Sequence, residues 1–97
     1  MTDAVEKLVT DVTYCKKLTI NSTSFVKASI NNNTEFVAKL VEVKNRSGVD
    51  IFVKPNDTDE FPLLDGEDRV IMTKTIGDIK LALQSAGTAT IHLLIEN

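Results

Sequence analysis

The sequence predicts a mainly β protein, an antiparallel β-sandwich or small barrel of about six to eight strands. Short apolar segments recur roughly every ten residues, and turn-forming residues separate them. Hydrophobic residues make up 42% of the chain but aromatic residues only 5%, so Val, Ile and Leu must build the core, and β-branched residues suit a pleated sheet. No helical pattern of about ten residues lies between the strands, which argues against a parallel βαβ sheet.

The 97 residues are expected to form a single domain around one core, with a β core over residues 15–97. Residues 1–14 leave two structures open, a short N-terminal helix or an extended arm. Asp3 and Glu6 have the spacing of a helix-capping box. Four apolar residues share one helical face: Val5, Leu8, Val9 and Val12. Against a helix, residues 9–14 are rich in strand formers.

The first strands are predicted at residues 17–20, which alternate polar and apolar, and at residues 25–30. Residues 21–23 form the turn between them. Residues 31–34 read as a loop, because Asn tolerates the left-handed backbone conformation that turns require.

The densest apolar region, residues 35–54, predicts two strands joined by a tight turn at residues 45–48. Gly48 is the residue best suited to positive φ in that turn. The first strand is apolar on both sides, which predicts a central strand covered on both faces. One side would carry Phe36, Ala38 and Leu40, and the other Val37, Val41 and Val43. In the second strand, Ile51 and Val53 share a face opposite to Phe52.

Residues 55–68 form the one long predicted loop, since two prolines and a glycine oppose regular structure over most of it. We expect at least one of Phe61, Leu63 and Leu64 to enter the core. Three strands should follow, over residues 69–73, 79–84 and 88–95, with turns at residues 75–78 and 85–87, the second closing a hairpin. The inward residues would be Ile79, Leu81, Leu83, Ala89, Ile91, Leu93 and Ile95.

No residue is predicted to be catalytic, to bind a cofactor or to ligate a metal, and the protein is not predicted to be an enzyme. The long loop has six acidic residues: Asp57, Asp59, Glu60, Asp65, Glu67 and Asp68. Its start resembles a calcium loop, but Phe61 and Pro62 occupy positions that need an oxygen ligand and a glycine, so a solvated loop is preferred. His92 falls on the outward side of its strand. Cys15 is expected to be a buried or half-buried structural thiol.

The net charge is −3 and no basic cluster exceeds Lys16–Lys17, which disfavours nucleic acid and anionic membranes as partners. The N-terminus does not read as a signal peptide and no apolar run is long enough to span a membrane, so we expect a protein made in a cytosol. Four Asn-x-Ser/Thr sequons occur, at Asn21, Asn32, Asn45 and Asn56, and are read as turn sequences.

Three segments resemble small β-sandwich structural proteins of tailed bacteriophages, of the head decoration or cement kind. They are Asn-Arg-Ser-Gly-Val-Asp-Ile-Phe-Val at 45–53, Phe-Pro-Leu with Gly-Glu at 61–67, and Ser-Ala-Gly-Thr-Ala-Thr-Ile at 85–91. The resemblance covers roughly the last two-thirds of the chain (residues 36–95) and rests on the order and spacing of strand–turn–strand signals that are individually generic.

The resemblance implies a virion protein, assembled in the host cytoplasm, that decorates or cements a capsid. Its partner would be the major capsid protein or another virion protein, and a homotrimer would match local three-fold positions of the shell. The candidate contact elements are residues 1–14 and the acidic loop 55–68. Two alternatives stay open: another virion component (a head–tail, tail or spike subunit), or a carbohydrate- or ligand-binding β-sandwich module.

Overall fold

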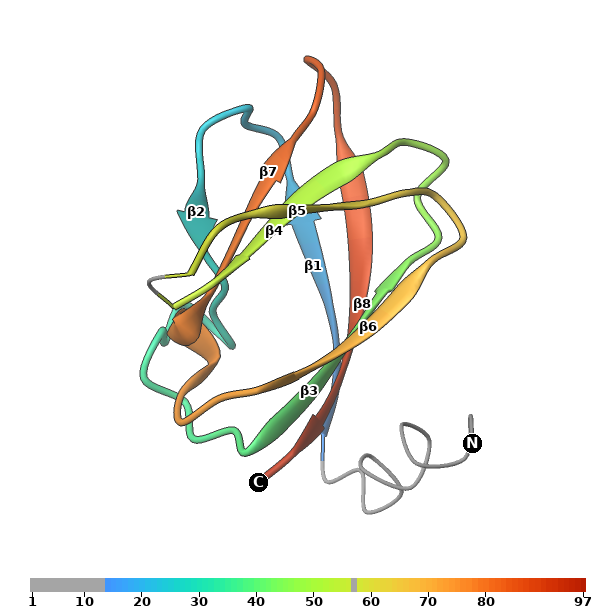
Figure 1. Ribbon diagram of the computed structural model, residues 1–97. Helices are drawn as coiled ribbons and strands as arrows, with labels where there is room; N and C mark the ends of the chain where they lie inside the picture. Colours follow the sequence, from blue (N-terminus) through green and yellow to red (C-terminus); the bar gives the residue numbers. More distant parts are fainter. Residues whose placement is uncertain (1–13, 57) are drawn as a thin grey trace.

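The computed structural model describes residues 14–56 and 58–97 and contains eight strands within them (Figure 1). The strands are β1 (Tyr14–Ile20), β2 (Val26–Lys27), β3 (Leu40–Asn45), β4 (Ile51–Pro55), β5 (Phe61–Leu63), β6 (Asp68–Met72), β7 (Ile79–Leu83) and β8 (Ala89–Glu96), with a 3₁₀ turn η1 (Ile76–Asp78) before β7. The predicted mainly β class is confirmed. The predicted N-terminal helix or arm lies outside the described residues, apart from Tyr14, which begins β1.

The strands form two four-stranded antiparallel sheets: sheet A, in the order β1-β8-β3-β6, and sheet B, in the order β2-β7-β4-β5. The chain is in effect one long hairpin that doubles back between β4 and β5. This pairs β1 with β8, β2 with β7, β3 with β6 and β4 with β5. Rolling that hairpin up pairs β8 with β3 and β7 with β4, which gives a jelly roll.

The hairpin predicted at residues 85–87 is wrong, and the two strands joined by the turn at residues 45–48 do not pair with each other either. β3 and β4 belong to different sheets, and so do β7 and β8, so the turns at residues 46–50 and 84–88 connect sheet A with sheet B. In Figure 1 the connection between β7 and β8 lies at the top of the sandwich and the connection between β3 and β4 at the upper right. A local turn signal reports that the chain reverses, but it does not report whether the next strand pairs with the previous one or faces it across the core.

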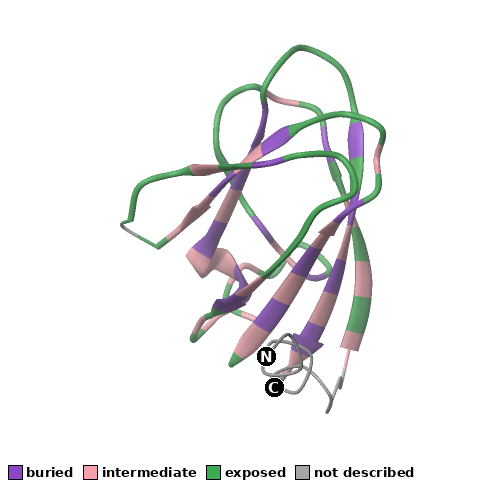
Figure 2. Cartoon of the chain, turned by 45° about the vertical axis from the view of Figure 1, so that its right-hand side comes forward, coloured by how far each residue is buried: buried purple, intermediate pink, exposed green. Residues whose placement is uncertain are grey.

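The core lies between the sheets (Figure 2), and the burial of residues alternates strictly along β3 and β8, whereas in β7 Ala82 is buried as well as Leu81 and Leu83. In β8, Ala89, Ile91, Leu93 and Ile95 are all buried, as predicted. In β3, Val41 and Val43 are buried while Leu40 is only half-buried. The expectation that this strand is covered on both faces is therefore wrong for the described residues, because sheet A is an outer layer of a two-layer sandwich.

The predicted acidic loop is not one element. Phe61–Leu63 forms edge strand β5, and Pro62 is accommodated there because an edge strand needs no N–H donor on its free side. Leu63 is buried in the core, which confirms the expectation for one of the loop's apolar residues. β5 runs along the edge of sheet B, so residues 58–60 lie at one end of this strand and residues 64–67 at the other (Figure 1).

Several turn predictions are confirmed by backbone angles. Asn31 and Asn32 adopt positive φ (51° and 64°), and so does Gly48 (86°). Gly77 in η1 is required for a different reason, a close approach: a Cβ there would lie 2.6 Å from the carbonyl oxygen of Thr34. The predicted strand at residues 25–30 shrinks to β2, which is followed by the buried residues Ala28 and Ile30.

Asp78 closes the turn between β6 and β7. The N–H groups of Lys74 and Thr75 donate to Asp78 Oδ2 (2.8 and 3.2 Å), and these bonds, the one from Lys74 first, lower the pKa of Asp78 below its ordinary 3.8. A lowered folded-state pKa means that folding favours the carboxylate. Its contribution is therefore present above the unfolded pKa and is lost as the pH falls through the folded one.

Asp78→Asn is expected to lower stability near neutral pH by about 1 kcal/mol or less and to flatten the loss of stability on acidification below about pH 4. Urea titrations between pH 7 and pH 2 measure both effects. Asp59→Asn is the control, because the carboxylate of Asp59 has no hydrogen-bond partner among the described residues. If the loss of stability below about pH 4 were the same in Asp78→Asn as in the unaltered protein, the Asp78 carboxylate would not stabilise this turn.

Candidate contact site

Two loops that are distant in sequence meet at one end of the sandwich and form what we call the paired-loop site, residues 46–50 and 64–67. Backbone hydrogen bonds join their bases: Asn45 N–H donates to Glu67 O (2.9 Å) and Gly66 N–H donates to Asn45 O (2.7 Å). The third connection at this end, residues 84–88, is held alongside by a bond from Gln84 N–H to Asp50 O (3.3 Å).

Asn45 is the only buried polar residue among those described, and its side chain binds the first loop and the last residue of β5, directly before the second loop. Its Nδ2 donates to Val49 O and to Leu63 O, both at 2.9 Å. Its Oδ1 accepts from Ser47 N–H (3.2 Å) and from Ser47 Oγ (2.7 Å). A buried amide that uses both donors and its acceptor fixes the geometry of its partners, because breaking any of these bonds leaves a polar group unsatisfied.

The acidic residues of the site support the loops. Asp65 Oδ1 accepts from Gly48 N–H (2.8 Å), and Asp50 Oδ1 accepts from Asp65 N–H (2.9 Å). Glu67 Oε1 accepts from Leu64 N–H (2.8 Å). Two of the six acidic residues of the predicted loop, Asp65 and Glu67, therefore accept backbone N–H groups, and both remain exposed to solvent as predicted.

An ion-pair cluster flanks the site at the start of β6. Asp68 contacts Arg46 (Oδ1 to Nη1, 2.5 Å; Oδ2 to Nη2, 3.0 Å) and Lys44 (Oδ2 to Nζ, 3.2 Å). Partial burial, the largest single influence, raises the pKa of Asp68, but the hydrogen bonds from Arg46 and Lys44 together outweigh it and lower that pKa. The cluster ties β3 to the edge strand β6.

The paired-loop site presents two apolar side chains to solvent. Val49 is 41% exposed and Leu64 is 44% exposed, although both lie in hydrogen-bonded loops. The exposed carboxylates of Asp50, Asp65 and Glu67 surround them. A depression of about 250 Å³ lies beside Val49 and is completed by residues 83–88. A rigid apolar pair within a polar rim is the arrangement of a small protein contact surface.

The other residues considered from the sequence lie elsewhere. His92 and Cys15 are both on the outer face of sheet A, and His92 points outward as predicted. Cys15 is exposed, so the expectation of a buried or half-buried thiol is wrong: β1 begins at Tyr14, and alternation places Cys15 outward. No group of three or more potential metal ligands occurs within residues 14–56 and 58–97.

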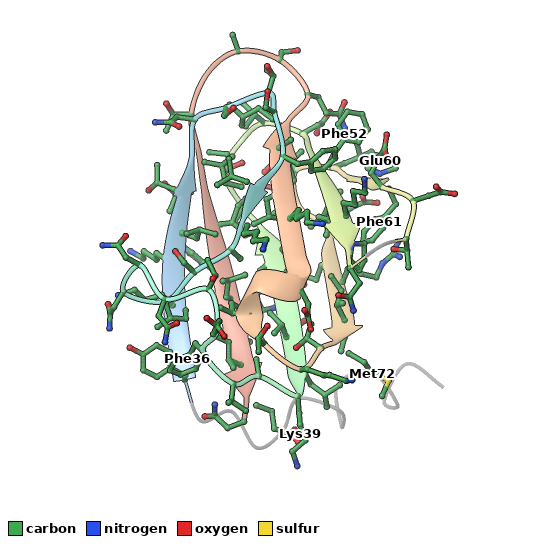
Figure 3. The ribbon with its side chains drawn as sticks, turned by 90° about the vertical axis from the view of Figure 1, so that its left-hand side faces the viewer. Phe36, Lys39, Phe52, Glu60, Phe61 and Met72 are labelled. Atoms are coloured by element: carbon green, nitrogen blue, oxygen red, sulfur yellow. The ribbon has the colours of Figure 1, made fainter. Side chains whose placement is uncertain are left out.

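The sequons fall as follows. Asn21, Asn32 and Asn56 are exposed in turns, whereas Asn45 is buried and fully hydrogen-bonded. Asp59 and Glu60 are exposed and precede β5, whereas residues 64–67 of the paired-loop site follow it, and Asp57 lies outside the described residues. Figure 3 shows Glu60 projecting beside β5.

Four of the five aromatic rings pack against another ring or a cation. Tyr14 packs against Phe36 with ring centroids 5.2 Å apart. The guanidinium of Arg69 lies 4.2 Å from the ring of Phe61, and Lys54 Nζ lies 5.7 Å from the ring of Phe25. Phe52, the remaining aromatic residue, is half-buried on β4.

The sequence predicted a turn at residues 45–48 and placed residues 65–67 in a loop, but it did not show that the two segments meet. The one local signal was Asn-x-Ser, because Asn and Ser side chains readily form hydrogen bonds with nearby backbone groups.

No helix within the described residues is long and apolar enough to cross a membrane. Comparison with known proteins finds no matching family model, no matching curated protein and no matching solved structure.

Proposed function

We propose that the protein is a virion structural protein, a non-catalytic capsid decoration or cement subunit that binds the outer surface of a tailed-phage head. The observation that carries the proposal is the paired-loop site. Two of the three segments that resemble phage structural proteins, residues 45–53 and 61–67, supply its loops and the strands that hold them. Segments that are generic singly thus build one surface together.

The chemistry of the site favours a protein partner. Its loops are fixed by hydrogen bonds before binding, so little conformational entropy is lost on contact. Val49 and Leu64 supply apolar area, and the surrounding carboxylates favour a partner surface that carries Lys or Arg around an apolar patch. The patch is small, so useful affinity requires repetition. A homotrimer that engages equivalent positions of the major capsid protein gains that affinity through avidity.

A carbohydrate-binding module has less support. Sugar sites in such modules use exposed aromatic faces, and four of the five aromatic rings here pack against another ring or a cation. The jelly-roll fold alone does not discriminate between these functions, because viral capsid proteins and lectins both use it.

The double variant Val49→Asp with Leu64→Asp is expected to bind particles at least about tenfold more weakly than the unaltered protein, because two carboxylates would be desolvated in the contact. The measurement is co-sedimentation of purified protein with phage heads assembled without it, titrated to saturation. The unaltered protein should saturate at a fixed stoichiometry per major capsid protein.

Val26→Asp is the matched control, since Val26 is also an exposed valine (53%) but lies on β2, away from the paired-loop site. It should bind as the unaltered protein does. Thermal unfolding of each variant separates loss of binding from loss of folding. Equal binding by the double variant and the control would remove the site from the contact, and no saturable binding by the unaltered protein would reject the decoration role.

A further inference from the structure

β6 is an edge strand of sheet A, so part of its backbone faces no neighbouring strand among the described residues. Just past one end of the β3–β6 pair, Thr73 N–H donates to Lys39 O (2.9 Å). Just past the other end, Asn45 N–H donates to Glu67 O (2.9 Å). Both bonds fit the register of the two strands, and hydrogen-bonded pairs alternate with non-hydrogen-bonded pairs in an antiparallel ladder. Every second residue of β6, counted from Asp68, therefore turns its backbone N–H and C=O groups away from β3.

Val70 and Met72 occupy two of these free positions, and their side chains lie on the outer face of sheet A. Met72 is 80% exposed and Val70 is half-buried. Figure 3 shows Met72 pointing away from the strands. The register places Leu40 opposite Met72. It also places Leu94 across Glu42 from Val70. The free edge therefore offers unpaired backbone groups beside an apolar strip.

The two charged residues of β6 do not oppose an added strand. Asp68 is held by hydrogen bonds from Arg46 and Lys44. The guanidinium of Arg69 lies over the ring of Phe61, 4.2 Å from its centroid. Unengaged charges and prolines are the features by which edge strands discourage pairing with another chain. The three residues that follow in β6 are all apolar, so this part of the edge is open.

The other edge strands of the two sheets are less suited to pairing. β5 contains Pro62, which has no N–H group to donate. β2 has only two residues. β1 carries Lys16 and Lys17, and lysine on an edge strand opposes the approach of another strand. Within the described residues, β6 is therefore the edge best able to accept a strand from another molecule.

β6 is also continuous with the paired-loop site. It begins at Asp68, directly after the second loop of that site, residues 64–67. From Asp68 to Met72 the strand extends by about 13 Å, so a short extended segment can cover the whole edge. A partner that is seated on the paired-loop site lies next to the first residue of β6, which is the reason to assign both surfaces to one partner.

We propose that an extended segment of the head protein that binds the paired-loop site pairs with β6 as an added strand of sheet A. The inference rests on the proposed function, because it assigns the segment to the same partner. Main-chain hydrogen bonds with Val70 and Met72 supply affinity. Alternate side chains of the segment lie on the outer face of sheet A, and apolar residues at those positions cover the apolar strip.

The test is amide hydrogen exchange of the full chain, free and bound to phage heads assembled without it. The protein is exchanged in heavy water, quenched, released from the heads in an organic solvent and measured amide by amide by NMR. We expect the amides of Val70 and Met72 to exchange at least about tenfold more slowly on the heads than in the free protein. The amides of Arg69 and Ile71 should be slow in both states, because they already bond to β3.

A pair of variants at one position separates the backbone bond from the side-chain contact. Val70→Pro removes a free N–H group and no bond of the sheet, and proline is tolerated on edge strands. Val70→Ala shortens the side chain but keeps the N–H group. Val70→Pro should bind heads at least about tenfold more weakly than Val70→Ala in co-sedimentation. Thermal unfolding checks that both variants fold.

The outcomes distinguish failure of the strand pairing from failure of the proposed function. Saturable binding without slower exchange at Val70 and Met72, or with equal affinity of the two variants, would overturn the strand pairing and leave the paired-loop contact in place. Slow exchange of both amides in the free protein would also overturn it, and a dependence on protein concentration would identify a second copy as the occupant of β6. Absence of saturable binding would reject the proposed function and this inference together.

Discussion

Asn45→Asp is expected to destabilise the protein by about 2–4 kcal/mol at neutral pH, although the two side chains have nearly the same shape. The asparagine donates from Nδ2 to two carbonyl oxygens, those of Val49 and Leu63, in a fully buried position. A carboxylate there has no hydrogen to donate and places negative charge against two buried acceptors. The measurement is urea-induced unfolding at pH 7.

The effect of Asn45→Asp should diminish as the pH is lowered. A carboxylate buried beside two carbonyl oxygens has a raised pKa in the folded state, so its protonation stabilises the fold and restores one donor. Asn21→Asp is the matched control: Asn21 is exposed, and the same substitution there should change stability by about 0.5 kcal/mol or less. If the two variants were equally stable, the bonds of Asn45 would not organise the loops.

Residue type and alternation were sufficient to predict most strands and their inward residues. β8 shows this best, because its four buried positions follow a period of two without exception. Turn positions were predicted for the same local reason, since Asn31, Asn32 and Gly48 are residues that tolerate positive φ. These properties depend only on neighbours in the chain.

Strand pairing could not be predicted in this way. Period two assigns a residue to a face but does not say which strand lies beside it, so the turns after β3 and β7 looked like hairpin turns although they cross between sheets. The short edge strand β5 was hidden by Pro62, which excludes a central strand but suits an edge.

The paired-loop site was out of reach for a further reason. Its contacts join residues about twenty positions apart, such as Gly48 with Asp65 and Asn45 with Leu63. The sequence shows the carboxylate of Asp65 as a charge in a loop, and only the fold shows that it accepts a backbone N–H group of another loop. Burial of Asn45 was equally hidden, since Asn is mostly an exposed residue.

Leu93→Ala is expected to destabilise the protein by about 2–5 kcal/mol, because the substitution removes three buried carbons and leaves a cavity. Leu93 is fully buried in β8, at the centre of sheet A, between Lys16 of β1 and Val43 of β3. Its side chain faces sheet B, so the cavity would open in the layer that holds the two sheets together. Urea-induced unfolding measures the change in the free energy of unfolding, and the dependence of that free energy on urea concentration is expected to stay the same.

Leu64→Ala makes the same chemical change at a side chain that is 44% exposed, and should lower stability by about 1 kcal/mol or less. The contrast tests the packing directly. The two leucines differ in burial and not in chemistry, so equal losses would mean that the outer and inner faces of β8 are wrongly assigned. A large loss for Leu93→Ala alone would place the main stabilisation between the sheets, and the paired-loop site could then be altered for binding without unfolding the sandwich that supports it.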